Sequence, residues 1–105
     1  MKTFILGRTI EELRRIIPQN QIKTIKLGDQ KICITRDGDS FFVFELLCPH
    51  RKADLSRGTI NNEEIICPLH EYRFDLKTGQ VRNAHCSDLR VYRTELTLEG
   101  LKIHF

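Results

Sequence analysis

The sequence has no long apolar stretch and no block of basic residues. No run approaches the roughly 18 apolar residues of a membrane-spanning helix, and the opening MKTFILGRTI has only a short apolar run, which Gly7 and Arg8 end. Such a run is too short for a secretory signal. The 17 Lys and Arg residues are interspersed with 14 Asp and Glu residues, so they form no basic stripe for nucleic acid. We therefore expect a cytoplasmic protein that binds neither membrane nor nucleic acid.

Repeats, low-complexity segments and flexible linkers are also lacking. With 105 residues, the chain is expected to form a single domain over residues 1–105. A domain of this size has a modest core. A metal centre that joined two loops would therefore contribute usefully to its stability.

One short helix is predicted near the start, in TIEELRRIIP. Thr9 is the expected N-cap, Glu12 stands three residues later as in a capping box, and Pro18 ends the helix. The apolar face of this helix would consist of Ile10, Leu13, Ile16 and Ile17.

From residue 22 onward the hydrophobic pattern has the period of β-strands. Strands are expected at 22–27, 31–36, 41–47, 64–66, 72–75 and 91–105. The last range should turn at Glu99-Gly100, and the following residues would then face one another across the hairpin: Leu96 and Leu98 on one side, Leu101, Ile103 and Phe105 on the other. These patterns predict a mostly β, antiparallel chain.

Two Cys/His pairs stand out in CPHRKADL (48–55) and CPLHEY (67–72). They supply Cys48, His50, Cys67 and His70, and each pair follows an apolar strand and begins a loop. Four cysteines in a chain without a recognisable secretion signal favour metal or redox chemistry over disulfides. A structural zinc-binding domain is one alternative, although common zinc modules pair cysteine with cysteine and histidine with histidine.

The paired motif CPHRKADL and CPLHEYRFDLKTGQV resembles that of the Rieske iron–sulfur family, in particular its small ferredoxins, over roughly residues 20–105. The resemblance implies antiparallel β-sheets with a cluster-binding subdomain of two loops, at about 47–57 and 66–79. It also implies one [2Fe-2S] cluster per chain. Cys48 and Cys67 would hold one iron, and His50 and His70 the other.

The ligand types bear on the reduction potential of such a cluster. Two thiolates and two neutral imidazoles leave the oxidised site uncharged, so an electron is added more easily than with four thiolates; potentials then lie at about −150 to +300 mV. Ala53 and Leu69 stand where high-potential relatives carry a disulfide, and Tyr72 and Phe74 stand at the positions of their hydroxyl donors. We therefore expect a low-potential centre.

Two departures from the ferredoxin pattern are visible. Lys52 stands where a glycine commonly follows the CPHR run, so the turn of the first loop could differ. The third loop, RNAHCSDL (82–89), lacks the usual proline-rich cover, which predicts greater solvent access to the cluster.

The resemblance implies a one-electron carrier rather than an enzyme. The protein would be a monomer in isolation and would pass electrons from a reductase to an oxygenase or another acceptor enzyme. A small Rieske subunit of an NAD(P)H-dependent nitrite reductase is the alternative.

The sequence also supports predictions for the remaining cysteines, for one further histidine and for the basic residues near the loops. Cys33 should be a core residue and Cys86 should pack in its loop; a disulfide between them would need Cα atoms within about 7 Å. His104 is expected to face solvent. The basic residues form either a solvated rim or a docking patch for an acidic redox partner; they are Arg51, Lys52, Arg57 and Arg73.

Overall fold

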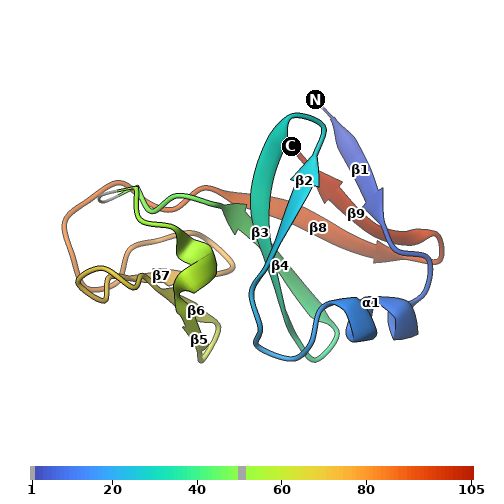
Figure 1. The fold of residues 1–105 in the computed structure, drawn as a ribbon, viewed down its shortest axis with the longest axis horizontal. Helices are drawn as coiled ribbons and strands as arrows, with labels where there is room; N and C mark the ends of the chain where they lie inside the picture. Colours follow the sequence, from blue (N-terminus) through green and yellow to red (C-terminus); the bar gives the residue numbers. More distant parts are fainter. Residues whose placement is uncertain (1, 50–51) are drawn as a thin grey trace.

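A computed structural model describes residues 2–49 and 52–105 and shows two antiparallel sheets. The larger has the strand order β1-β9-β8-β4-β3-β2 and the smaller the order β5-β6-β7. The small sheet and its loops lie at one end of the long axis, and α1 and the β8–β9 turn lie at the other (Figure 1). The strands are β1 (Thr3–Leu6), β2 (Lys23–Leu27), β3 (Gln30–Asp37), β4 (Ser40–Glu45), β5 (Thr59–Asn61), β6 (Glu64–Ile66), β7 (Arg73–Asp75), β8 (Val91–Thr97) and β9 (Gly100–His104).

The mostly β, antiparallel prediction is confirmed, and so are the first two hairpins. Strands β2 and β3 pair from Lys23↔Ile34 to Leu27↔Gln30, and Gly28-Asp29 connects them. Strands β3 and β4 continue the sheet through the predicted turn after Asp37. Alternating apolar residues flanked by glycine turns specify this arrangement locally.

Helix α1 (Ile10–Ile16) begins as predicted, because the Thr9 hydroxyl accepts a hydrogen bond from the Glu12 N–H at 3.1 Å. Leu13 and Ile17 are buried against the large sheet, but Ile16 is 41% exposed, so its assignment to the apolar face was wrong. A helix of seven residues buries only a narrow stripe, and positions 13 and 17 occupy it. In the described part of the chain, no helix has the length and apolar character needed to cross a membrane.

The β8–β9 hairpin differs from its prediction in two ways. It turns at Leu98-Glu99, one residue early, since Thr97 pairs with Gly100. Leu101 is buried as expected, whereas Leu96 is 43% exposed and Leu98 fully exposed. The alternating pattern identifies two faces of the hairpin, but the core does not extend beneath its tip.

His104 is less exposed than predicted. It pairs with Thr3 in the neighbouring strand β1, and its side chain is only 19% exposed. Its Nδ1 lies 3.3 Å from the Thr3 hydroxyl and its Nε2 lies 3.6 Å from a Glu95 carboxylate oxygen. The prediction of a solvent-facing side chain was therefore wrong, because the side chains of Thr3 in β1 and Glu95 in β8 lie against the imidazole.

The small sheet carries the second loop and is built from three short strands. Asn62 and Glu63 both have positive φ, which is the conformation of a two-residue turn between β5 and β6. Ile65 of β6 pairs with Phe74 of β7, and both are fully buried. A 3₁₀ helix, η1 (Leu55–Arg57), precedes this sheet.

One apolar cluster joins the two sheets, because it takes residues from β3 and β4 on one side and from β6 and β7 on the other. Its fully buried members include Cys33 and Phe44 from the large sheet and Ile65 and Phe74 from the small one. Cys33 is therefore the core residue that was predicted. All four cysteines lie among the described residues and carry thiols, so Cys33 and Cys86 are not joined.

Gly79 fixes where the third loop meets the small sheet. Its φ is +80°, and an added Cβ would collide with the Leu89 carbonyl. The two residues lie close together because the N–H of Leu89 donates to the Gly79 carbonyl at 2.7 Å. A side chain at this position is therefore excluded by both backbone conformation and space.

We predict that Gly79→Ala lowers the stability by about 3 kcal/mol, or roughly 15 °C in melting temperature. Gly38→Ala is the matched control, since Gly38 also has positive φ (+61°) but no atom within 4 Å of an added Cβ. That variant should lose only the cost of the left-handed conformation, about 1–2 kcal/mol. Equal losses in thermal denaturation would contradict the crowding argument.

A second prediction concerns the buried thiol of Cys33. Burial and the nearby Asp54 carboxylate raise its pKa, and a hydrogen bond with Thr24 lowers it by less, so the pKa rises from 9.0 to about 12. The folded protein then holds this proton more tightly than the unfolded chain, so its contribution to stability is present below pH 9.0 and is lost as the pH rises toward 12.

Cys33→Ala, which removes the thiol without overpacking the core and cannot ionise, should therefore lose less stability than the wild type over this alkaline range. Melting temperatures of both proteins across the range test this, because the other alkaline groups titrate in both. Parallel curves would show that the Cys33 thiol does not contribute.

Candidate metal centre

Each of the two predicted loops is closed by a backbone hydrogen bond, and the two bonds are equivalent. The N–H of Cys48 donates to the carbonyl of Ala53 at 2.9 Å, and the N–H of Cys67 donates to the carbonyl of Tyr72 at 2.8 Å. In both loops the bond joins a cysteine to the fifth residue after it. Each loop thus starts from a fixed cysteine, and its histidine falls within the closed segment.

The first loop departs from the pattern at Lys52, and the structure shows how. Lys52 has a φ of 55°, and its N–H donates to the Cys48 carbonyl at 2.7 Å. This left-handed conformation favours glycine, so the lysine adopts the backbone shape that glycine would supply more easily. His50 and Arg51, which precede it, lie outside the described residues.

The exit from the first loop is anchored by Asp54. Its carboxylate accepts from the Ser56 N–H at 2.9 Å and from the Ser56 hydroxyl at 2.6 Å, which caps η1. These bonds hold the pKa of Asp54 below its usual value, and Arg57 adds to the effect. Leu55 behind it is fully buried and donates its N–H to the Leu46 carbonyl at 2.8 Å.

The second loop turns sharply at the predicted ligand. His70 and Glu71 have φ values of 63° and 54°, both left-handed. Two consecutive residues of this kind are costly outside glycine and occur where surrounding contacts impose them, often at functional sites. His70 is exposed, and its ring centroid lies 6.5 Å from that of Tyr72.

Burial separates the two kinds of candidate ligand. Cys48 and Cys67 are both fully buried and belong to the apolar cluster that joins the sheets. His70 is exposed at the surface of its loop. Thiol sulfurs buried in an apolar cluster and an imidazole at the surface suit an iron–sulfur cluster with mixed sulfur and nitrogen ligands, so the described donor residues fit such a cluster.

The candidate set is incomplete in the structure because His50 is not described. Within the residues that are, no three His, Cys, Asp or Glu side chains gather closely enough to hold one metal ion. A Rieske cluster takes two protein ligands on each iron and so does not require three side chains at one point. The four-ligand assignment stays a prediction.

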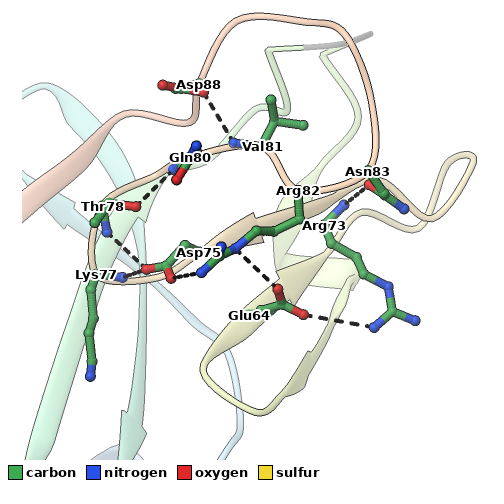
Figure 2. Close-up of polar contacts among 10 residues, drawn as sticks. All are labelled: Glu64, Arg73, Asp75, Lys77, Thr78, Gln80, Val81, Arg82, Asn83 and Asp88. Atoms are coloured by element: carbon green, nitrogen blue, oxygen red, sulfur yellow. Dashed lines mark hydrogen bonds and ion pairs between the residues drawn. The ribbon is translucent and has the colours of Figure 1, made fainter.

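The third loop is tied to the small sheet beside the second loop. The Arg82 N–H donates to the Arg73 carbonyl at 2.8 Å, and the Asp75 N–H donates to the Gln80 carbonyl at 2.9 Å. Residues 80–82 thus run as a short extension along β7. The Asp88 carboxylate accepts from the Val81 N–H at 3.1 Å and holds the far side of the loop (Figure 2).

Cys86 in this loop packs against the apolar cluster, as predicted. Burial raises the pKa of its thiol, and the neighbouring Cys48 and Asp88 raise it further. Because Cys86 packs against the cluster that contains Cys48 and Cys67, the third loop lies beside the cysteine side of the site, although it lacks prolines.

A group of charged side chains links the small sheet to the third loop. The Arg82 guanidinium lies between Asp75, at 2.6 Å, and Glu64, at 3.5 Å, and Arg73 approaches Glu64 from the other side at 3.8 Å (Figure 2). Burial acts to raise the pKa of Asp75, but bonds from the Thr78 and Lys77 N–H groups and from Arg82 outweigh it, so the pKa is lowered.

Arg73 contacts Glu64 at 3.8 Å, but it is exposed, as are Lys52 and Arg57 of the same predicted set. Arg51 lies outside the described residues. A docking role for this set stays a prediction.

Curated relatives of this chain include ferredoxin CarAc of Metapseudomonas resinovorans. It is 33% identical over 72 residues, which cover 68% of this chain and 67% of that protein. Across this and two further ferredoxin relatives, the chain spans 61% to 67% of the relative's length.

Among solved structures, the ferredoxin of carbazole 1,9a-dioxygenase from Nocardioides aromaticivorans IC177 superposes with a TM-score of 0.81 at 25% identity, covering 99% of this chain and 98% of that one. A Mycobacterium tuberculosis protein described as the small subunit of an NADH-dependent nitrite reductase shares the fold, with a TM-score of 0.78 at 17% identity over 97% of this chain and 93% of that one.

Residues 10–93 match the family described as Rieske [2Fe-2S] domain. This match takes in both closed loops and most of the two sheets. The chain therefore belongs to the Rieske [2Fe-2S] domain family, which binds an iron–sulfur cluster.

Proposed function

We propose that this protein is a one-electron carrier that holds one [2Fe-2S] cluster per chain. Cys48 and Cys67 would bind one iron, and His50 and His70 the other. The observation that carries the proposal is the pair of loops closed by equivalent cysteine N–H bonds, with both thiols buried in one apolar cluster. Residues 1–105 would act as a single unit around this centre.

When bound, the cluster supplies a centre that takes up and gives off a single electron. The surrounding residues set how easily this happens. The apolar cluster excludes water from the cysteine side, where Phe74 is fully buried and offers no hydrogen-bond donor. Ala53 and Leu69 cannot form the disulfide of high-potential relatives. These features support a low-potential centre.

The exposed side of the site supports transient docking of redox partners. Leu47 precedes the first loop and Leu69 lies within the second, and they are 43% and 38% exposed; Lys52 and Arg57 are exposed nearby in sequence. A small apolar contact with a charged rim suits a partner that must dissociate after one electron. By analogy with the ferredoxin relatives, electrons would pass from a reductase to an oxygenase, with this chain a cytoplasmic monomer between encounters.

A role as the small subunit of a nitrite reductase is the second candidate, favoured by the fold likeness described above. The two candidates differ in how permanently the chain associates. Permanent co-purification with a large catalytic partner would support the subunit, and isolation of the chain alone would support the carrier.

Spectroscopy tests the cluster directly. The purified protein should show the visible absorption of a [2Fe-2S] centre and, after dithionite reduction, the low-temperature EPR signal of a mixed-ligand cluster. A colourless protein that contains one zinc ion would overturn the proposal.

Replacing His70 by cysteine tests the ligand assignment. A thiolate in place of a neutral imidazole adds negative charge to the site, so the midpoint potential should fall, on the order of 100 mV. His85→Cys is the matched control, because His85 is an exposed histidine of the third loop and its replacement should leave the potential unchanged. Equal potentials for the wild type and His70→Cys would refute the assignment of His70.

A further inference from the structure

The side chain of Asn83 forms hydrogen bonds with the residues on either side of Tyr72, where the second loop ends. Its Oδ1 accepts from the Arg73 N–H at 2.9 Å, and its Nδ2 donates to the Glu71 carbonyl at 3.2 Å. Figure 2 shows the Asn83 amide directed at the backbone of Arg73, next to the charged group of β6 and β7. Nothing in the sequence pattern of this polar loop distinguishes Asn83 from its neighbours.

These two bonds extend the pairing between residues 80–82 and β7 beyond its last backbone hydrogen bond. Arg82 still pairs with Arg73 through its N–H, but beyond this point the third loop turns away. A side-chain amide offers one acceptor and two donors, so it can pair with a backbone much as a peptide group does. Asn83 therefore supplies, through its side chain, the next pair of hydrogen bonds to the residues that end the second loop.

The segment that Asn83 holds needs such support. His70 and Glu71 are both left-handed, a conformation that costs free energy for residues other than glycine. The Tyr72 carbonyl is bonded to the Cys67 N–H, which fixes the loop only at its base. The bond to the Glu71 carbonyl reaches inside that closure, directly after the histidine.

We propose that Asn83 is a positioning residue for His70: by holding Glu71 and Arg73, it fixes the backbone that presents the imidazole to the cluster. The inference rests on the proposed function, since it takes His70 as a ligand. Without Asn83 the imidazole would sample a wider range of orientations. Partners that orient a metal ligand in this way tune both the affinity and the electronic properties of the site.

The test uses the cluster-loaded protein with two variants and one control. Asn83→Ala removes both bonds, and Asn83→Asp keeps the acceptor for the Arg73 N–H but loses the donor to the Glu71 carbonyl. Thr78→Val is the matched control: the Thr78 hydroxyl accepts from the Gln80 N–H at 3.1 Å, so this variant also loses one side-chain-to-backbone bond at the start of the same connection, away from the His70 loop.

Four readouts are measured, of which the EPR line width and the midpoint potential separate positioning from general stability. In Asn83→Ala, the EPR lines of the reduced protein should broaden, the midpoint potential should shift, and cluster loss to a chelator should become about tenfold faster. Hydrogen exchange of the Arg73 amide should also accelerate in Asn83→Ala and return to the wild-type rate in Asn83→Asp. Thr78→Val should match the wild type in all of these.

Failure of the inference is distinguishable from failure of the proposed function. If the wild type gives the mixed-ligand EPR signal while Asn83→Ala leaves line widths and potential unchanged, Asn83 does not position His70, whatever happens to exchange. Equal changes in Thr78→Val would likewise overturn the inference. A wild type without the signal refutes both proposals.

Discussion

The site depends on one constraint, the hydrogen bond by which each candidate cysteine closes its own loop. Cys48 and Cys67 are fixed at their N–H groups by carbonyls five residues later, and their thiols are fixed by burial in the cluster that joins the two sheets. Backbone closure and side-chain burial thus act on the same two residues. The large sheet contributes Cys33 and Phe44 to that cluster, so it supports the loops although it carries only the first of them.

The third loop completes this arrangement through polar rather than apolar contacts. Arg82 lies between Asp75 and Glu64, and Asp88 holds the Val81 N–H. Such exposed ion pairs contribute little stability individually, and the register of residues 80–82 along β7 is defined by the backbone bonds of Arg82 with Arg73 and of Asp75 with Gln80. That register decides which side chain faces the exit of the second loop, and it places Asn83 there.

Much of the fold was predictable because it is locally encoded. The hairpins around Gly28 and Gly38 follow from strand period and turn residues, and the start of α1 follows from Thr9. The errors share a different cause. The tip of the last hairpin carries Leu98 into solvent, because periodicity separates two faces without showing how far the core extends.

Within the site, the Cys/His spacing predicted the loops, but not what shapes them. The left-handed Lys52 is closed by a local bond to Cys48, whereas the amide bonds of Asn83 join residues 10 and 12 positions apart, which a local pattern does not encode. The full burial of Cys48 and Cys67 has a consequence for maturation. If these two cysteines hold the cluster as proposed, delivery of iron and sulfide would require the two loops to part first, which would couple assembly of the centre to opening of the folded chain.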